Sequence, residues 1–298
     1  MGHAQAGRAG RAALTGRRVV YAGTLVAIGG NEDEHGPCDV LGAVAAHARG
    51  GPLAVVTAAS TQPERRWQSY ERTFRRLGVR ALRHVHVDAR QGAHAAAKLL
   101  GDATAVFITG GDQFRLVERL GGTVVHEAIA AVVRAGGVVA GTSAGAAALG
   151  AVMIGGSVDP ASGAGLRTVP GLGLLPNAIV EQHCSQRGRR PRLAAAVARH
   201  PGVVGLGIDE NTAVVCDASG WLRVVGAGCV CVLDDHHSDA HGDAAADRLA
   251  MADGGHAPGH AAAAPLRVLT AGDRYNAARA HRRADCGQDT HARAAIAS

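Results

Sequence analysis

The chain has 298 residues, and its hydrophobic content of 47% is enough to fill the core of one large α/β domain or two smaller ones. The net charge of +6 rests on arginine, but aromatic residues make up only 3% and no helix-turn-helix or zinc-finger spacing occurs, which argues against a nucleic-acid partner. No apolar run approaches the roughly 18 residues of a membrane span, and the N-terminal segment lacks the apolar core of a signal peptide. We therefore expect a cytoplasmic protein that does not enter a membrane. The six cysteines lack CxxC spacing, which is typical of reduced thiols.

The N-terminal half alternates predicted strands with predicted helices. Residues 1–17 are rich in Gly, Ala and Arg without periodicity and are predicted to form a flexible tail. Apolar, strand-like runs lie at residues 18–28, 53–57, 81–87 and 105–109, and helical patterns at residues 64–76, 93–100, 114–120 and 124–135. In the first of these helices Trp67, Tyr70, Phe74 and Leu77 recur at helical spacing and predict a buried stripe. This alternation predicts an α/β fold with a parallel-sheet core and helices on both faces.

The next strand-like run, which begins at Val138, ends in Gly141-Thr142-Ser143-Ala144-Gly145. This sequence matches G-x-S-x-G, in which a serine on a tight strand-to-helix turn projects its hydroxyl from the backbone. The small neighbours let a helix leave at once, and the N–H of Ala144 then lies at a helix N-terminus, where negative charge is favoured. A glycine-rich chain also produces such a match by chance, so a turn that only packs is the alternative.

The C-terminal half is predicted to contain shorter strands and one helix. Strand-like runs lie at residues 178–180, 203–208 and 266–269, a helix at 192–199, and a β-meander at 213–216, 222–225 and 230–233. Residues 234–264 are dominated by His, Asp, Gly and Ala, which predicts a solvated flexible insert, with metal binding by its histidines as the alternative. We expect residues 18–276 to form a single domain and residues 277–298 to be a disordered tail.

Candidate catalytic residues lie at the ends of predicted strands, which is where a parallel sheet binds its ligands. A serine nucleophile needs a base, and the base needs an acid that orients it. His183 lies at the end of one predicted strand and Glu210 at the end of another, so they are the candidate base and acid for Ser143. The alternatives are that His183 is a structural histidine and that Glu210 is a turn or cap residue. The Gly110-Gly111 turn permits close approach to a substrate, so the N–H groups of Gly111 and Ala144 are the candidate oxyanion hole.

A loop at residues 187–192 carries four arginines and lies just after His183. Such a charge run is usually a solvated face, but Gly188 and Pro191 favour a shaped loop over a helix. Arginines in such a loop can clamp a carboxylate through two parallel hydrogen bonds.

These motifs, in this order, resemble those of the cyanophycinases, which belong to the S51 family of serine peptidases together with peptidase E, an aspartyl dipeptidase. The resemblance covers about residues 18–233, and residues 269–275 are similar to the closing segment of the family. The motifs are Gly29-Gly30-Asn31-Glu32, Gly110-Gly111-Asp112-Gln113, Gly141-Thr142-Ser143-Ala144-Gly145-Ala146, Gln182-His183 with Arg187, Arg189 and Arg192, and Gly207-Ile208-Asp209-Glu210-Asn211-Thr212.

The resemblance implies a fold like that of the class I glutamine amidotransferases and a triad of Ser143, His183 and Glu210. It also implies a pocket for a β-aspartyl-arginine unit, lined by Gln113, Glu181, Gln182, Arg187, Arg189 and Arg192. The family generally has aspartate where this chain has Glu181, which is one methylene longer. A second acid after the serine has been suggested for the family, and Asp159 is its nearest match here, but Glu210 is preferred.

The substrate implied by the resemblance is cyanophycin, a poly-aspartate chain with arginine on each β-carboxyl, or related β-aspartyl peptides. The implied product is the β-Asp-Arg dipeptide, formed without a metal or organic cofactor by a homodimer. An Asp-X dipeptidase of the same family and a binding protein with a silent site are the alternatives.

Overall fold

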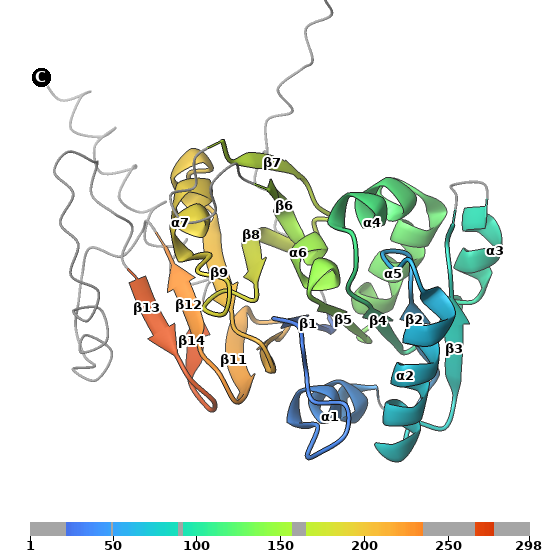
Figure 1. Cartoon of the computed structure of the whole chain (residues 1–298). Coiled ribbons are helices and arrows are strands. Elements are labelled where there is room, and N and C mark those ends of the chain that lie inside the picture. The colour runs from blue at the N-terminus through green and yellow to red at the C-terminus, as the bar shows by residue number, and fades with distance from the viewer. Residues whose placement is uncertain (1–21, 49, 89–91, 157–164, 235–265, 277–298) are drawn as a thin grey trace, which may run out of the picture.

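The computed structural model describes residues 22–48, 50–88, 92–156, 165–234 and 266–276 (Figure 1). The predicted tails at residues 1–17 and 277–298 lie outside these ranges. Asp159 and all but the first residue of the predicted insert at residues 234–264 also lie outside them. The organisation into a single domain stays a prediction.

Eight of the described strands form one sheet in the order β14-β11-β10-β1-β5-β4-β2-β3. Its parallel core consists of β1 (Thr24–Ile28), β5 (Val138–Thr142), β4 (Ala105–Ile108), β2 (Leu53–Val56) and β3 (Leu82–Val85). Its antiparallel side consists of β10 (Thr212–Cys216), β11 (Trp221–Gly226) and β14 (Arg274–Asn276). Every residue of β2, β4 and β5 is buried, because helices cover both faces, and this is why these strands are almost continuously apolar. The predicted α/β class with a parallel core is confirmed.

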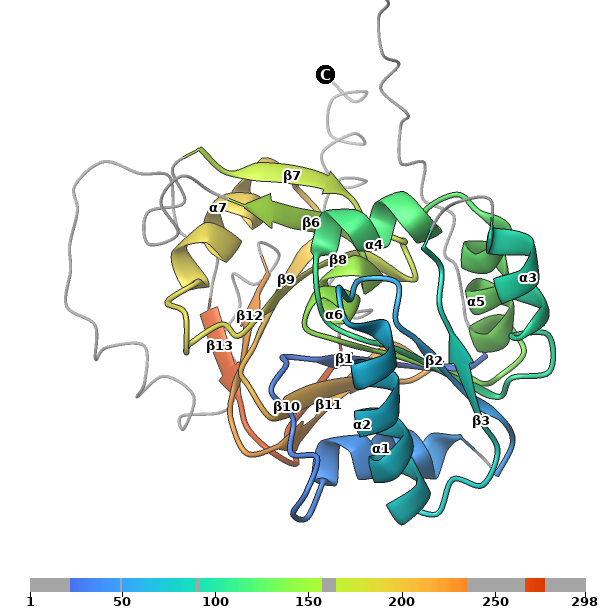
Figure 2. The same ribbon diagram turned by 45° about the vertical axis from the view of Figure 1, so that its right-hand side comes forward.

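Helices cover both faces of this sheet (Figure 2). On one face lie α1 (Asp39–His47) and α2 (Pro63–Arg76), and on the other α3 (Ala93–Lys98), α4 (Gln113–Leu120), α5 (Val124–Arg134) and α6 (Ala144–Leu149). Tyr70 and Phe74 of α2 are buried, and the Tyr70 ring centroid lies 4.7 Å from that of Phe107 in β4. The predicted stripe is therefore part of the core.

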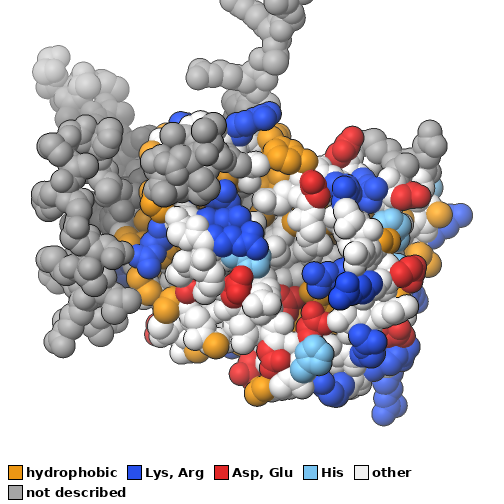
Figure 3. Space-filling view, viewed as in Figure 1, with side chains coloured by type: hydrophobic (Ala, Val, Ile, Leu, Met, Phe, Trp, Pro, Cys, Tyr) orange, Lys and Arg blue, Asp and Glu red, His pale blue; other side chains and the backbone are white. Residues whose placement is uncertain are grey.

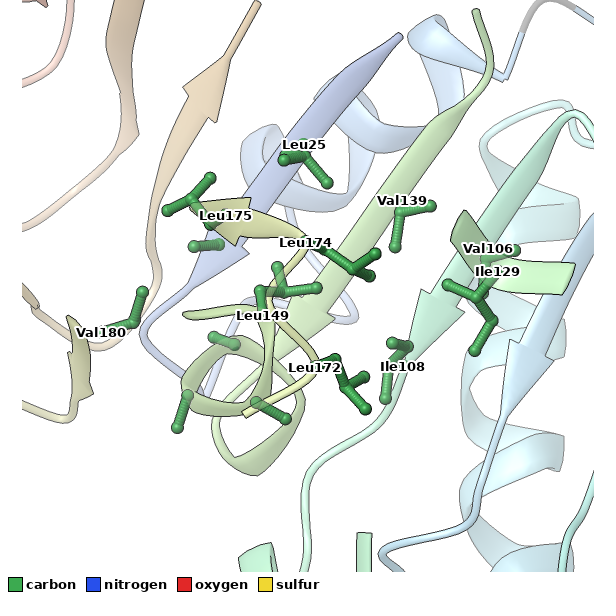
Figure 4. Packing of buried hydrophobic residues seen from close by; sticks show 14 of the residues in the cluster. Leu25, Val106, Ile108, Ile129, Val139, Leu149, Leu172, Leu174, Leu175 and Val180 are labelled. Atoms are coloured by element: carbon green, nitrogen blue, oxygen red, sulfur yellow. The ribbon is translucent and has the colours of Figure 1, made fainter. Parts of the chain in front are cut away.

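A second sheet, which the sequence patterns did not predict, contains six described strands in the order β13-β12-β9-β8-β6-β7. They are β6 (Gly150–Gly156), β7 (Arg167–Pro170), β8 (Leu175–Gln182), β9 (Val204–Ile208), β12 (Val230–Leu233) and β13 (Leu266–Leu269). Helix α7 (Arg190–Arg199) packs on one face through Leu193 and Val197. Leu175 and Val180 join Leu149 of α6 and Val139 of β5 in one core cluster (Figure 4). Helix α6 therefore lies between the two sheets.

The predicted β-meander is only partly present. Strands β10 and β11 pair antiparallel, joined by a turn at Asp217, whose side chain accepts hydrogen bonds from the N–H groups of Ser219 and Trp221. Strand β12 does not continue that sheet but pairs with β9 and β13 in the second one. All four residues of β12 are buried, and an apolar strand of this kind is stabilised between two neighbours with both faces covered.

Gly145 of α6 and Gly42 of α1 provide a matched test of the packing behind the turn at Ser143. A Cβ on Gly145 would lie 2.3 Å from the carbonyl oxygen of Ile108, whereas one on Gly42 would meet nothing within 4 Å. We expect Gly145→Ala to lower the free energy of unfolding by about 1–3 kcal/mol, because of overpacking. Gly42→Ala should raise it by about 0.5–1 kcal/mol, because alanine restricts the unfolded chain. Urea unfolding followed by circular dichroism measures both, and equal stability of the two variants would contradict this packing.

Candidate active site

The last residue of β1 and the loop that follows it bind three distant segments by backbone hydrogen bonds. The acceptors are the carbonyl groups of residues 28–30, and the donors are the N–H groups of Ser143, His183 and Asn211, at 3.0, 2.9 and 2.9 Å. Ser143 follows β5 in the first sheet, while His183 and Asn211 follow β8 and β9 in the second. These three bonds therefore bring the strand ends of both sheets together at one place.

Ser143 has the backbone geometry of a nucleophile elbow. Its φ of 51° and ψ of −112° lie in a sparsely populated region, and α6 begins at the next residue. A Cβ on Gly141 would lie 2.4 Å from the carbonyl oxygen of Gly145, so the turn is too tight for a side chain there. The strained backbone and the small neighbours together leave the serine hydroxyl projecting from the turn.

Ser143, His183 and Glu210 form a continuous chain of hydrogen bonds. The Oγ of Ser143 lies 2.9 Å from Nε2 of His183, and Nδ1 of His183 lies 2.6 Å from Oε1 of Glu210. An ionised carboxylate only accepts hydrogen bonds, so the imidazole proton lies on Nδ1 and the lone pair of Nε2 faces the serine hydroxyl. Such an arrangement is able to take a proton from the serine when its oxygen attacks a carbonyl carbon.

The surroundings of His183 and Glu210 favour a neutral base beside an ionised acid. Burial lowers the pKa of His183 below the ordinary value for histidine, and the hydrogen bond to Glu210 opposes that change. Burial raises the pKa of Glu210, but the hydrogen bonds from His183 and Asn31 outweigh it, and the pKa lies below the ordinary value. At neutral pH the imidazole is therefore neutral and Glu210 is charged.

Gly30 and Asn31, in the loop after β1, contact the hydrogen-bonded residues His183 and Glu210. The sequence analysis predicted no catalytic role for either of them. The Nδ2 of Asn31 donates a hydrogen bond of 2.9 Å to Oε2 of Glu210. Gly30 packs against His183, since a Cβ at residue 30 would lie 2.4 Å from the Cε1 of the ring. Both residues have positive φ, 98° for Gly30 and 47° for Asn31. Gly and Asn are the residues that adopt this conformation most readily, so Gly-Asn at a strand end was the available signal.

Asp209, which precedes Glu210, fixes the loop that follows His183. Its Oδ1 accepts a hydrogen bond from the N–H of Ser185, at 3.0 Å, and its Oδ2 accepts one from Cys229, at 3.1 Å. This carboxylate thus joins the ends of β8 and β9 to the start of β12.

The Gly110-Gly111 turn lies directly beside Ser143. A Cβ on Gly110 would lie 3.1 Å from the Cβ of Ser143, and one on Gly111 would lie 2.3 Å from the carbonyl oxygen of Ala59. Gly111 has a φ of 145°, which favours glycine. The N–H groups of Gly111 and Ala144 stay the predicted oxyanion hole, and the close approach of the turn to the serine supports that prediction.

Five of the six predicted substrate-binding residues form one polar network. Gln182 donates from Nε2 to Gln113, at 3.4 Å, and its Oε1 accepts from Arg189, at 2.8 Å. Glu181 accepts two hydrogen bonds of 2.7 Å from Arg192 and one of 3.3 Å from Arg189. The network therefore runs from the start of α4 to the start of α7.

Within this network Glu181 and Arg192 bind each other instead of facing open space. Their residues are only 1% and 6% exposed. Burial raises the pKa of Glu181, and the hydrogen bonds and charge of Arg192 oppose that rise. The Glu181 carboxylate, in β8, thus binds Arg189 and Arg192, and the direct contact of Glu181 and Arg192 with substrate stays a prediction.

Arg187, the sixth predicted residue, is exposed and stands outside the network. Its backbone N–H donates to the backbone carbonyl oxygen of His183, at 3.1 Å, which closes a turn directly after β8. Figure 3 shows Lys and Arg side chains gathered near the middle of the face, with a histidine and an acidic side chain at their edge. This basic surface suits the approach of carboxylates.

The described part of the chain contains no group of three or more His, Cys, Asp and Glu side chains placed to hold a metal ion. The absence of a cofactor stays a prediction, because the histidine-rich insert lies outside the described ranges. No helix in those ranges is long and apolar enough to span a membrane.

The match to a known family agrees with this geometry. Residues 45–223, more than half of the chain, match the peptidase family S51. The chain belongs to peptidase family S51. The resemblance seen in the motifs is thereby confirmed, and this S51 member is a serine-type peptidase, a hydrolase.

Similar proteins cover most of the chain. It is 35% identical to a cyanophycinase of Geminocystis herdmanii over 264 residues, which are 85% of this chain and 93% of the relative. It is 37% identical over 217 residues to a cyanophycinase of Trichormus variabilis, covering 70% of this chain and 73% of the relative. A crystal structure of a peptidase from an acI-B1 actinobacterium has a TM-score of 0.63 at 22% identity and covers 86% of this chain and 98% of its own. This last similarity supports the fold.

The titration of His183 tests the electrostatics of the site. We expect its imidazole to titrate below pH 6.5, because burial disfavours the charged form. In Glu210→Gln the midpoint should fall further, because the partner that stabilises imidazolium is lost. Proton and nitrogen NMR of the imidazole measures both midpoints, with His183→Gln to assign the signals. A midpoint that rises in Glu210→Gln would contradict the contact.

The buried ion pair of Glu181 and Arg192 predicts that replacing one partner lowers the stability more than replacing both. Glu181→Gln leaves the Arg192 guanidinium buried without its charged partner and should lower the free energy of unfolding by about 3–5 kcal/mol. Replacing both residues, as Glu181→Gln with Arg192→Met, should recover much of that loss, because the guanidinium of Arg192 is removed as well and only that of Arg189, whose side chain is 14% exposed, stays without its carboxylate. Urea unfolding measures the set, and a single variant as stable as the wild type would contradict the pairing.

Proposed function

We propose that this peptidase hydrolyses cyanophycin, multi-L-arginyl-poly-L-aspartate, and releases β-Asp-Arg dipeptides as an exopeptidase. The relatives named cyanophycinase support the substrate. The observation that carries the reaction is the chain of hydrogen bonds from Ser143 through His183 to Glu210, at 2.9 and 2.6 Å.

In the acylation step His183 removes the hydroxyl proton of Ser143 through Nε2 while the serine oxygen attacks the aspartyl carbonyl carbon. The N–H groups of Gly111 and Ala144 stabilise the oxyanion of the tetrahedral intermediate. The intermediate then collapses, the C–N bond breaks, and His183 donates its proton to the leaving amine. The product of this step is an ester of Ser143.

In the deacylation step water replaces the amine. His183 takes a proton from that water, the new oxyanion forms in the same place, and collapse releases the carboxylate and restores Ser143. Glu210 remains ionised throughout and stabilises the imidazolium that forms in each step. This role agrees with the lowered pKa of Glu210, in which burial is outweighed by its two hydrogen bonds.

Substrate recognition divides the polar residues into two groups. Arg187 and Arg189 bind substrate carboxylates, and the amides of Gln113 and Gln182 supply neutral hydrogen-bonding groups. Glu181 and Arg192 line the same pocket and also support it, because Glu181 accepts a hydrogen bond from Arg189 and so holds that guanidinium in place. The homodimer and the cytoplasmic location stay predictions.

Removal of the nucleophile tests the proposal. Ser143→Ala should lower the release of β-Asp-Arg from insoluble cyanophycin by about four to six orders of magnitude, because the covalent step is lost. Chromatography of the soluble products measures release, and circular dichroism checks that the variant folds. Unchanged release would contradict the proposal.

Two further measurements separate the alternatives. Faster hydrolysis of Asp-X dipeptides than of cyanophycin by the wild type would identify an Asp-X dipeptidase. Failure both to cleave peptides and to react at Ser143 with a fluorophosphonate would identify a binding protein with a silent site.

A further inference from the structure

We propose that Asn31 is a positioning residue of the active site, whose side-chain amide holds the Glu210 carboxylate so that one oxygen faces His183. This inference rests on the proposed function, because it assigns Asn31 a part in the proton transfer from Ser143. Asn31 does not belong to the polar network of the substrate pocket, so its effect is on the chemical step and not on substrate binding.

The geometry assigns each oxygen of Glu210 a separate partner. Oε1 faces Nδ1 of His183 at 2.6 Å, and Oε2 accepts from Nδ2 of Asn31 at 2.9 Å. Two donors on different oxygens fix the plane of a carboxylate, whereas with a single donor the carboxylate can still rotate about the bond that joins it to the rest of the side chain. The Glu210 side chain is 26% exposed, so solvent has access to it and packing alone does not hold it. The second donor is therefore what keeps Oε1 directed at His183.

The backbone of the loop places Asn31 for this contact. Gly30 and Asn31 have consecutive positive φ angles, a conformation that glycine and asparagine adopt most readily. The carbonyl group of Gly30 accepts from the N–H of Asn211, at 2.9 Å, and the side-chain oxygen of Asn211 accepts from the N–H of Asp33, also at 2.9 Å. These two bonds tie the loop to the segment that carries Glu210.

The side chain at residue 31 must satisfy two conditions at once. Asparagine tolerates a left-handed backbone better than other residues with a side chain, and its amide nitrogen is a donor that suits a carboxylate. Because an ionised carboxylate only accepts hydrogen bonds, the amide is oriented with Nδ2 toward Glu210. Glycine keeps the backbone and lacks the donor, so Asn31→Gly removes the contact without strain.

A double-mutant cycle tests whether Asn31 acts through Glu210. The readout is the rate at which a fluorophosphonate labels Ser143, which requires the serine and its proton acceptor but no peptide substrate. Asn31→Gly should lower this rate about tenfold, which is the order expected for a hydrogen bond to a charged group. With Glu210→Ala already present, Asn31→Gly should cause no further loss, because its acceptor is gone.

Asn177→Gly is the matched control. Asn177 also has a positive φ, 55°, and it is exposed near the start of β8, at the opposite end of that strand from His183. Its replacement by glycine should leave the labelling rate unchanged, and circular dichroism should show all single variants folded. In steady-state hydrolysis of cyanophycin, Asn31→Gly should lower kcat and leave KM unchanged.

The other outcomes of these experiments contradict the role of Asn31, the proposed function or both. A wild-type labelling rate in Asn31→Gly, or an equal loss with and without Glu210, would refute the role of Asn31. Labelling of wild-type Ser143 without cleavage of cyanophycin would refute the proposed substrate, and the cycle would still decide the role of Asn31. No labelling of wild-type Ser143 would refute both proposals.

Discussion

The site depends on three successive carbonyl groups, those of Ile28 at the end of β1 and of Gly29 and Gly30 in the loop that follows it. They accept hydrogen bonds from the backbone N–H groups of Ser143, His183 and Asn211, and so fix backbone positions that side-chain rotation does not change. Ser143 and His183 both have positive φ, a conformation that persists only where surrounding contacts impose it. The central strand of one sheet thereby sets the distance between a serine in that sheet and a histidine in the other. The loop also supplies Gly30 and Asn31, which contact the histidine and its acid.

The polar network beside this loop shows how the charge of the pocket is shared. Arg192 and Arg189 both bind Glu181, so two positive charges meet one negative charge inside the protein. A buried pair of this kind contributes little net stability, since the loss of hydration offsets the attraction, but removing one partner is costly. The pair therefore works as a rigid support for Arg189, and the exposed Arg187 carries its charge at the surface.

The sequence predicted the parts of the fold that local patterns determine. Apolar strands, helical stripes and the G-x-S-x-G turn are properties of neighbouring residues, and they predicted the parallel core and the turn at Ser143. The second sheet escaped prediction because β6 pairs with β7 and β8 with shifts in register, and because β12 joins strands that are distant in sequence. The contact of Asn31 with Glu210 spans 179 residues. The sequence reveals there only that residues suited to positive φ follow a strand.

The difference in burial between His183 and Glu210 determines which of them accepts the proton of Ser143. The histidine side chain is 8% exposed, and burial keeps it neutral, so its Nε2 is free to accept a proton. The acid is 26% exposed, and two hydrogen bonds overcome its smaller loss of hydration, so it stays ionised. If their depths were exchanged, burial would favour a protonated acid and solvent would favour a charged histidine. The ends of two adjacent strands, β8 and β9, thus place a base and an acid at depths that give each the protonation state proton transfer requires.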